Sequence, residues 1–234
     1  LSHILPLDTK ILRLDKDSAR REGRMEEILD KFAAGEAQVL AGTQMLSKGH
    51  HFPGVTLVVA ADGDIGLNLP DYRAAERTFQ LLVQVSGRAG RGDKPGEVLI
   101  QTRNPNHYCW KFVRENDYAG FFEREKGLRE KYLYPPFVKL GLVRMNYPLD
   151  YDQGRTKIME LARVLGRMSA KYGVRALGPA PSPLGLLRGR KRFQCLLKAK
   201  DWPPIRSVYA GIKDALSAYP KIRASLDLDP VNML

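Results

Sequence analysis

Several features that commonly assign a chain to a class are missing from these 234 residues. The two cysteines, Cys109 and Cys195, lie far apart and form no C-x-x-C pair. We therefore expect neither a disulfide framework nor a bound metal, and predict that both are small core residues. The chain has no signal peptide and no apolar run of membrane-spanning length, which favours a cytoplasmic location.

Phosphate-binding signatures of nucleotide-hydrolysing enzymes are also missing. The chain contains no G-x-x-x-x-G-K-[ST] loop and no D-E-x-H tract. A complete nucleotide cradle is therefore not expected within these residues.

Positive charge is present in excess, and it is unevenly distributed. The net charge is +12. Residues 1–140 contain 21 Lys+Arg and 19 Asp+Glu, whereas residues 141–234 contain 17 and 7, so the last part carries +10. Such an excess indicates a polyanionic partner. The alternative is a basic surface that binds nothing.

Strand-like and helix-like segments alternate in the first half of the chain. Apolar residues at i, i+3, i+4 and i+7 from Met25 to Phe32 predict an amphipathic helix that ends near Gly35. The continuous apolar run 55–61 predicts a strand buried on both faces, as in a parallel sheet. Further strands are expected at 10–15, 39–41 and 97–102, and a second helix at 71–91. This alternation predicts an α/β layer structure with a parallel sheet.

The end of the second predicted helix carries a candidate anion site. Gln84, Arg88 and Arg91 are spaced i, i+4 and i+7, which places them on one helical face. Gly87 and Gly90 leave that face bare, so a ligand can approach closely. Two guanidinium groups with a clear approach suit a polyphosphate. The alternative is a helix end whose arginines interact only with the helix dipole and solvent.

The segment 42–53 is a second candidate for phosphate binding. Its Gly42-Thr43 turn follows a predicted strand, and the exposed N–H groups and hydroxyl suit a phosphate oxygen. Lys48 adds a positive charge, and Gly49 adds a permissive backbone. The alternative is a loop with ordinary turn chemistry.

A third polar segment, Asp62-Gly63-Asp64, follows the apolar run. In open α/β sheets, ligands bind beyond the carboxyl ends of the strands, where this segment is expected to lie. The two carboxylates are therefore candidate site residues, and simple loop capping is the alternative.

These segments together carry a family resemblance. The motifs G-T-Q-M-L-S-K-G-H-H-F-P, Asp-x-Asp and Q-V-S-G-R-A-G-R occur in this order. They resemble the second RecA-like lobe of superfamily 2 helicases, and the G-H-H-F-P wording resembles the primosomal replication-restart DNA helicases. The resemblance implies that Arg88 and Arg91 are arginine fingers for a bound nucleotide.

The resemblance also implies roles for the remaining candidates. Gly42, Thr43 and Lys48 would grip a DNA strand by its phosphates. The residues implied to contact or sense the nucleotide are Gln84, Gly49, Asp62 and Asp64.

Cofactors are implied by the resemblance alone. In this family the nucleotide cradle and the magnesium carboxylate lie on a first lobe, and paired zinc sites require eight cysteines. The resemblance therefore implies a C-terminal fragment that meets ATP and Mg²⁺ bound mainly by the other lobe, with zinc only in the intact family member.

The second half of the chain repeats a pattern of strands and helices. Alternating apolar residues predict strands at 139–145 and 223–229, and further strands are expected at 174–177 and 192–197. Apolar residues at helical spacing predict helices at 158–165 and 205–216. The order βαββαβ predicts a smaller α+β ferredoxin-like domain. Proline disfavours helix around Tyr134–Phe137, which marks a boundary. The expected domains are a RecA-like lobe at 1–112, a helical connector at 113–137 and a DNA-binding domain at 138–234.

The segment 178–193 is expected to be a proline-stiffened hairpin loop between two of these strands. Its cluster of four basic residues can follow a phosphate backbone. Those residues are Arg188, Arg190, Lys191 and Arg192. A solvated charged loop is the alternative.

Two functions from different classes remain open on the sequence. The resemblance implies the C-terminal part of an ATP-dependent 3′–5′ DNA helicase that recognises stalled forks and restarts replication by primosome assembly. Its implied partners are forked and single-stranded DNA, single-stranded-DNA-binding protein and primosome proteins. The alternative is a non-catalytic nucleic-acid-binding module of an RNA- or ribosome-associated factor.

Overall fold

The structure is a computed structural model that describes residues 4–15, 23–43, 52, 54–87 and 96–233. The chain divides into two compact units. The first comprises Leu1–Leu69 and Arg73–Tyr118, and the second comprises Pro70–Tyr72 and Ala119–Leu234.

The first unit begins with a β-α-β segment. Strands β1 (Ile11–Leu14) and β2 (Val39–Gly42) pair in parallel, with Ile11 opposite Val39. Helix α1 (Arg24–Ala33) connects them and buries Ile28 and Leu29 beside Leu14. The apolar spacing therefore predicted this helix and its buried face correctly.

A second parallel pair follows in the same unit. Strands β3 (Leu57–Ala60) and β4 (Glu97–Ile100) pair with Leu57 opposite Glu97. Between them lie α2 (Asp64–Leu67) and α3 (Ala74–Ser86), and α4 (Tyr108–Glu115) follows β4. Helix α3 buries one side and packs against β3 and α4. Helix α4 was not expected from the sequence.

The prediction that β3 is buried on both faces is wrong for the described residues. Leu57 and Val59 are 51% and 57% exposed, and Leu99 on β4 is 47% exposed. The described part of this sheet has two strands. Every second side chain along these two strands is therefore exposed in the described part of the chain.

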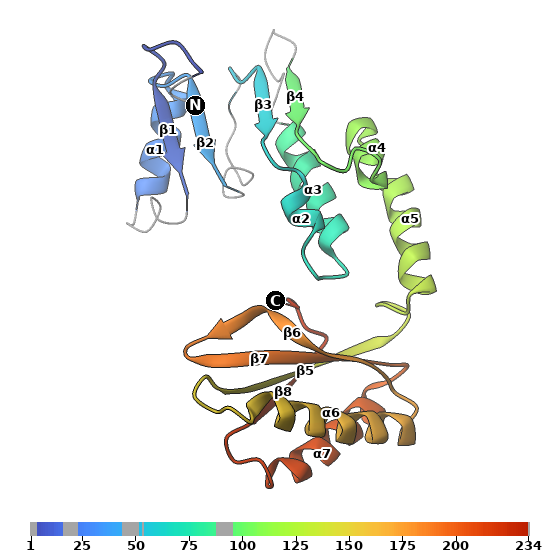
Figure 1. Ribbon diagram of the computed structural model, residues 1–234. Helices are drawn as coiled ribbons and strands as arrows, with labels where there is room; N and C mark the ends of the chain where they lie inside the picture. Colours follow the sequence, from blue (N-terminus) through green and yellow to red (C-terminus); the bar gives the residue numbers. More distant parts are fainter. Residues whose placement is uncertain (1–3, 16–22, 44–51, 53, 88–95, 234) are drawn as a thin grey trace. The chain divides into compact units, whose positions relative to one another are not determined.

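The second unit contains an antiparallel four-stranded sheet. Helix α5 (Tyr118–Lys131) leads into β5 (Lys139–Pro148), α6 (Gly154–Lys171), β6 (Arg175–Leu187), β7 (Arg190–Ala199), α7 (Trp202–Leu216) and β8 (Arg223–Leu228). The strands lie in the order β6-β7-β5-β8, and α6 and α7 cover one face together (Figure 1). The β-α-β-β-α-β order from β5 to β8 is the one that the sequence predicted.

The core of this unit lies between the sheet and the two helices. Side chains of one parity point into it from the strands, including Met145 and Leu197, which are both 0% exposed. Ile158 and Leu161 of α6 and Ile205 of α7 meet them. The apolar spacing within both helices predicted this burial.

The prediction of a proline-stiffened loop at 178–193 is wrong. Strand β6 continues to Leu187, and only Arg188 and Gly189, both at positive φ, form the turn to β7. Register shifts interrupt the β6–β7 pairing on either side of Pro181. Because β6 is an edge strand, a proline there can direct its missing N–H away from the ladder.

Candidate functional site

The carboxyl ends of β3 and β4 meet at one edge of their parallel sheet. Ala61 and Asp62 follow β3, and Gln101 and Thr102 follow β4. The amide N–H of Gly63 donates to the Gln101 carbonyl at 2.9 Å, and the N–H of Gln101 donates to the Ala60 carbonyl at 2.9 Å. The two loops are thereby held side by side.

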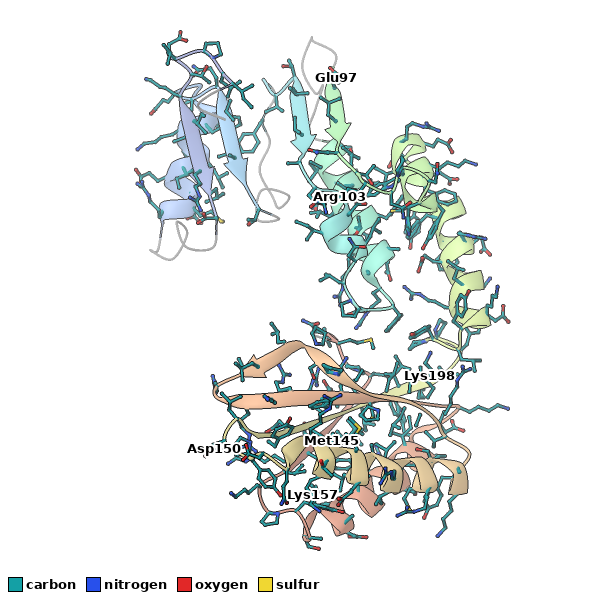
Figure 2. The ribbon with its side chains drawn as sticks, viewed as in Figure 1. Glu97, Arg103, Met145, Asp150, Lys157 and Lys198 are labelled. Carbon is teal, nitrogen blue, oxygen red and sulfur yellow. The ribbon has the colours of Figure 1, made fainter. Side chains whose placement is uncertain are left out.

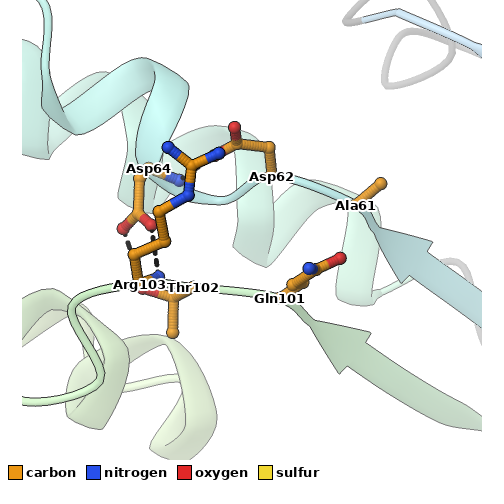
Figure 3. Close-up of a pocket in the computed structure, with 6 residues that line it drawn as sticks. All are labelled: Ala61, Asp62, Asp64, Gln101, Thr102 and Arg103. Atoms are coloured by element: carbon orange, nitrogen blue, oxygen red, sulfur yellow. Dashed lines mark hydrogen bonds between the residues drawn. The ribbon is translucent and has the colours of Figure 1, made fainter.

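The Asp64 carboxylate joins these loops. Its Oδ1 accepts from the Thr102 hydroxyl at 2.7 Å, and its Oδ2 accepts from the Arg103 N–H at 2.6 Å (Figure 3). The residue is only 6% exposed. These hydrogen bonds, from the Arg103 backbone first and then from Thr102, lower the pKa of Asp64. Both oxygens of Asp64 are thus engaged within the protein.

Asp62 and Gly63 shape the turn beside Asp64. Asp62 Oδ1 accepts from the Asp64 N–H at 3.0 Å. A Cβ on Gly63 would lie 2.8 Å from Ile100 Cγ2, so a larger residue would require that side chain to shift. The pocket lined by Asp62, Asp64 and Arg103 has a volume of about 30 Å³. A ligand pocket is typically about 300 Å³ or larger, so a nucleotide does not fit inside it.

The sequence interpretation missed the β4 side of this edge. Thr102 Oγ1 also accepts from the Asn104 N–H at 3.0 Å, and Trp110 Nε1 donates to the Asn104 carbonyl at 2.7 Å. A continuous set of hydrogen bonds therefore runs from Asp64 to α4. The parallel placement of two strand ends was the available signal, because the polar residues after both strands should meet at one edge.

The other predicted residues of the first unit are only partly described. Gln84 is exposed near the end of α3, and Gly42 and Thr43 are exposed at the end of β2. The Thr43 N–H donates to the Leu14 carbonyl at 3.3 Å. Four further predicted residues lie outside the described part of the chain: Lys48, Gly49, Arg88 and Arg91.

The basic residues of the second unit do not form one loop cluster. Arg188 lies in the turn, whereas Arg190, Lys191 and Arg192 belong to β7. Because side chains alternate along a strand, Arg190 and Arg192 lie on one face and Lys191 on the other. Arg190 Nε donates to Asn146 Oδ1 on β5, and its Nη2 donates to the Lys221 carbonyl at 2.9 Å.

The described residues contain neither a candidate metal cluster nor a helix that could span a membrane. Within the described residues, no group of three or more His, Cys, Asp or Glu could hold a metal ion. Across the same part of the chain, every helix is too short or too polar to cross a membrane.

Comparisons with known proteins assign each unit to a class. Residues 3–93 match the helicase conserved C-terminal domain, and residues 130–231 match the primosomal protein N C-terminal domain. The chain thus joins the C-terminal domain of a helicase to a domain of a primosomal protein.

Individual relatives extend this assignment over the whole chain. The replication restart protein PriA of Bacillus subtilis is 36% identical over 100% of this chain, and that of Treponema pallidum is 38% identical over 96%. The protein of the same name from Synechocystis sp. is 38% identical over 97%. The chain belongs to the PriA family, and it spans 29%, 34% and 27% of the length of these three relatives.

Proposed function

We propose that the chain supplies the second motor lobe and the C-terminal domain of an ATP-dependent 3′–5′ DNA helicase. This helicase would recognise stalled replication forks and restart replication by assembling a primosome. The observation that carries the proposal is that the similarity to replication restart protein PriA extends through both units. The helicase match over 3–93 also disfavours a non-catalytic module of an RNA- or ribosome-associated factor.

In the proposed motor, residues 1–112 form the RecA-like lobe. Arg88 and Arg91 stabilise negative charge on the transferring phosphate, since positioned guanidinium groups act most strongly where charge develops. Gln84 is oriented between the nucleotide and the DNA. Gly49 allows the backbone to approach the nucleotide closely. The exposure of Gln84 on α3 supports its access to a ligand.

Contacts with the translocated strand are assigned to Gly42, Thr43 and Lys48. The exposed positions of Gly42 and Thr43 at the carboxyl end of β2 support this assignment. Backbone N–H groups and hydroxyls of this kind bind phosphate oxygens without reading the base. Binding of the strand would therefore be independent of DNA sequence, as translocation requires.

The roles of Asp62 and Asp64 differ. Asp64 has both oxygens occupied by Thr102 and Arg103, which does not fit a magnesium ligand or a nucleotide contact. We assign Asp64 to holding the β3 and β4 loops together. Asp62 remains the residue of this pair that would sense the nucleotide. ATP with Mg²⁺ would be held mainly by a first lobe that these residues do not include.

The C-terminal domain, residues 138–234, is proposed to bind forked and single-stranded DNA, and residues 113–137 to connect it to the lobe. Its ferredoxin-like order of elements and its excess of basic residues support this role. The basic segment from Arg188 to Arg192 supplies phosphate contacts. Single-stranded-DNA-binding protein and primosome proteins would be its protein partners.

A chimaera tests the motor assignment. This chain replaces the aligned segment of the Bacillus subtilis relative, and DNA-stimulated ATP hydrolysis is measured for the chimaera and for its Arg91→Ala variant. Loss of an arginine finger should lower turnover about a thousandfold or more, while nucleotide binding changes little. Arg114→Ala on α4, whose side chain is 80% exposed, is the matched control and should retain turnover. Near-normal turnover of the Arg91→Ala variant would show that Arg91 is not an arginine finger.

A further inference from the structure

One face of the sheet in the second unit carries no helix. The open face is defined here as the side of β5, β6, β7 and β8 opposite α6 and α7 (Figures 1 and 2). Lys198, labelled in Figure 2, points to this side, and Met145 points to the helices. Along β5 and β7, every second residue therefore belongs to the open face.

Strand register divides the open face into two parts. Near Leu140 and Leu142 it is apolar and covered, because Val138 and Met233 pack there together with Tyr134. Beyond Leu142 the register places two polar rows across three strands. The first row is Gln194, Arg144 and Ser225, and the second is Arg192, Asn146 and Arg223. Arg190 extends the second row along β7, opposite Pro148.

Charge in these rows is almost entirely positive. Arg144 is paired with Asp227, at 3.0 Å between Nη1 and Oδ2, so this arginine is already neutralised. The remaining cations are Arg190, Arg192 and Arg223, and the two rows contain no carboxylate. Three guanidinium groups on the face opposite the two helices suit an anionic ligand.

Arg192 and Arg223 leave room for a ligand, whereas Arg190 is already hydrogen-bonded to Asn146 and to the Lys221 carbonyl. Arg192 makes only a long contact, 3.4 Å from Nη1 to the Leu184 carbonyl. Among the described residues, the Arg223 side chain has no hydrogen-bond or ion-pair partner. Burial first, and then the nearby charge of Arg223, lower the pKa of Arg190, while the Asp150 carboxylate acts in the opposite direction. An anion between the two arginines would relieve their repulsion.

Neutral polar atoms point to the same ligand chemistry. Asn146, Ser225 and Gln194 are side chains of the kind that position nucleic-acid backbones through phosphate and sugar contacts. Neither row contains an aromatic side chain, so base stacking is not available there.

We infer that the open face from Arg144 to Arg190 binds the phosphate backbone of single-stranded DNA, without selecting its bases. The inference rests on the proposed function, because it assigns a surface to the DNA-binding role of the C-terminal domain. Three neighbouring strands span about 10 Å, which suits one extended strand better than a duplex. Arg188 in the turn and Lys191 on the opposite face lie outside this surface.

A salt titration of the whole chain tests the surface. Binding of dye-labelled oligothymidine and oligoadenosine is measured by fluorescence anisotropy between about 50 mM and 200 mM salt. The open-face variant replaces Arg190, Arg192 and Arg223 with Gln. Each lost phosphate contact should reduce the slope of log affinity against log salt by about 0.7, and the total reduction should be roughly 2. The loss should be equal for both oligonucleotides.

The matched control removes the same charge from the helix-covered side. It replaces Arg163, Arg167 and Lys171, which are all exposed on α6, with Gln. Circular dichroism confirms that each variant is folded. The inference requires the control to keep the wild-type slope.

Two results would contradict the proposed DNA-binding surface. If the wild-type chain binds DNA and the open-face variant keeps its slope, the inference is wrong, and DNA binding by the domain must use another surface. If the wild-type chain shows no binding at the lowest salt, the inference is also wrong. In both cases the motor assignment is judged separately, by ATP turnover of the Arg91→Ala chimaera.

Discussion

A buried lysine shows how one residue can conflict with its surroundings. Lys198 is 4% exposed, donates from Nζ to the Tyr132 carbonyl at 2.9 Å, and lies 3.4 Å from the centroid of the Tyr134 ring. Burial, with a smaller contribution from the nearby Arg175, lowers the pKa of Lys198 to about 8. The hydrogen bond and the ring offset only part of the cost of burying the charge.

This shift predicts a pH dependence of stability. The unfolded chain has the higher lysine pKa, so it binds more protons than the folded chain between about pH 8 and 10.5. Lys198 therefore opposes folding below pH 8, and the free energy of unfolding should rise by about 1–3 kcal/mol as pH increases through that window. Lys198→Met should remove this rise, whereas Lys200→Met, at the exposed neighbour, should retain it.

Urea unfolding measures the effect at several pH values. A Trp110→Phe background leaves Trp202, at the start of α7, as the reporter of the second unit. Identical pH profiles for the Lys198 and Lys200 variants would show that burial does not lower the pKa of Lys198.

At the scale of an element, β6 depends on one glycine. Gly178 has φ +109, and a Cβ there would lie 2.7 Å from the Gln194 carbonyl oxygen of β7. The position combines a backbone conformation that other residues rarely adopt with close contact to the neighbouring strand. The irregular pairing of β6 with β7 therefore requires glycine at this point.

Gly178→Ala should destabilise the second unit by about 1–3 kcal/mol, since both strain and overlap oppose the new methyl group. Gly166→Ala is the control, because a Cβ there meets no atom within 4 Å and the residue lies inside α6. That change should stabilise the unit by about 0.5–1 kcal/mol. Urea unfolding followed at Trp202 compares the two variants, and effects of the same sign would contradict this account.

At the scale of the whole molecule, the proposed motor is incomplete within this chain. It contains no Walker-type phosphate loop, and the pocket at the β3–β4 edge, at about 30 Å³, cannot enclose a nucleotide. Arginine fingers stabilise a transition state only when another site holds the nucleotide. The two residues assigned to that role therefore need the remaining part of a helicase.

The chain alone should accordingly show no DNA-stimulated ATP hydrolysis above background. Phosphate release is measured with and without single-stranded DNA, with the Arg88→Ala variant purified in parallel to detect contaminating activity. A DNA-stimulated signal that disappears in Arg88→Ala would contradict the division of the motor between two lobes.

Local patterns in the sequence determined the type and order of most elements. Apolar spacing predicted α1, α6 and α7, and alternation predicted β5 and β8, because each signal depends on neighbouring residues. The residues of three short sequence motifs indicated the family, and the comparisons confirm it. These are properties that a short stretch carries by itself.

Tertiary structure decided what depends on distant residues. Asp64 meets Thr102 38 positions later, so its engagement could not be read from the Asp-x-Asp motif alone. Strand β6 continues through its prolines because it pairs with β7 on one side only. Arg190, Arg192 and Arg223 share a face because register with β5 aligns β7 and β8. A run of basic residues shows how much charge is present, but strand pairing determines which side of the sheet carries it.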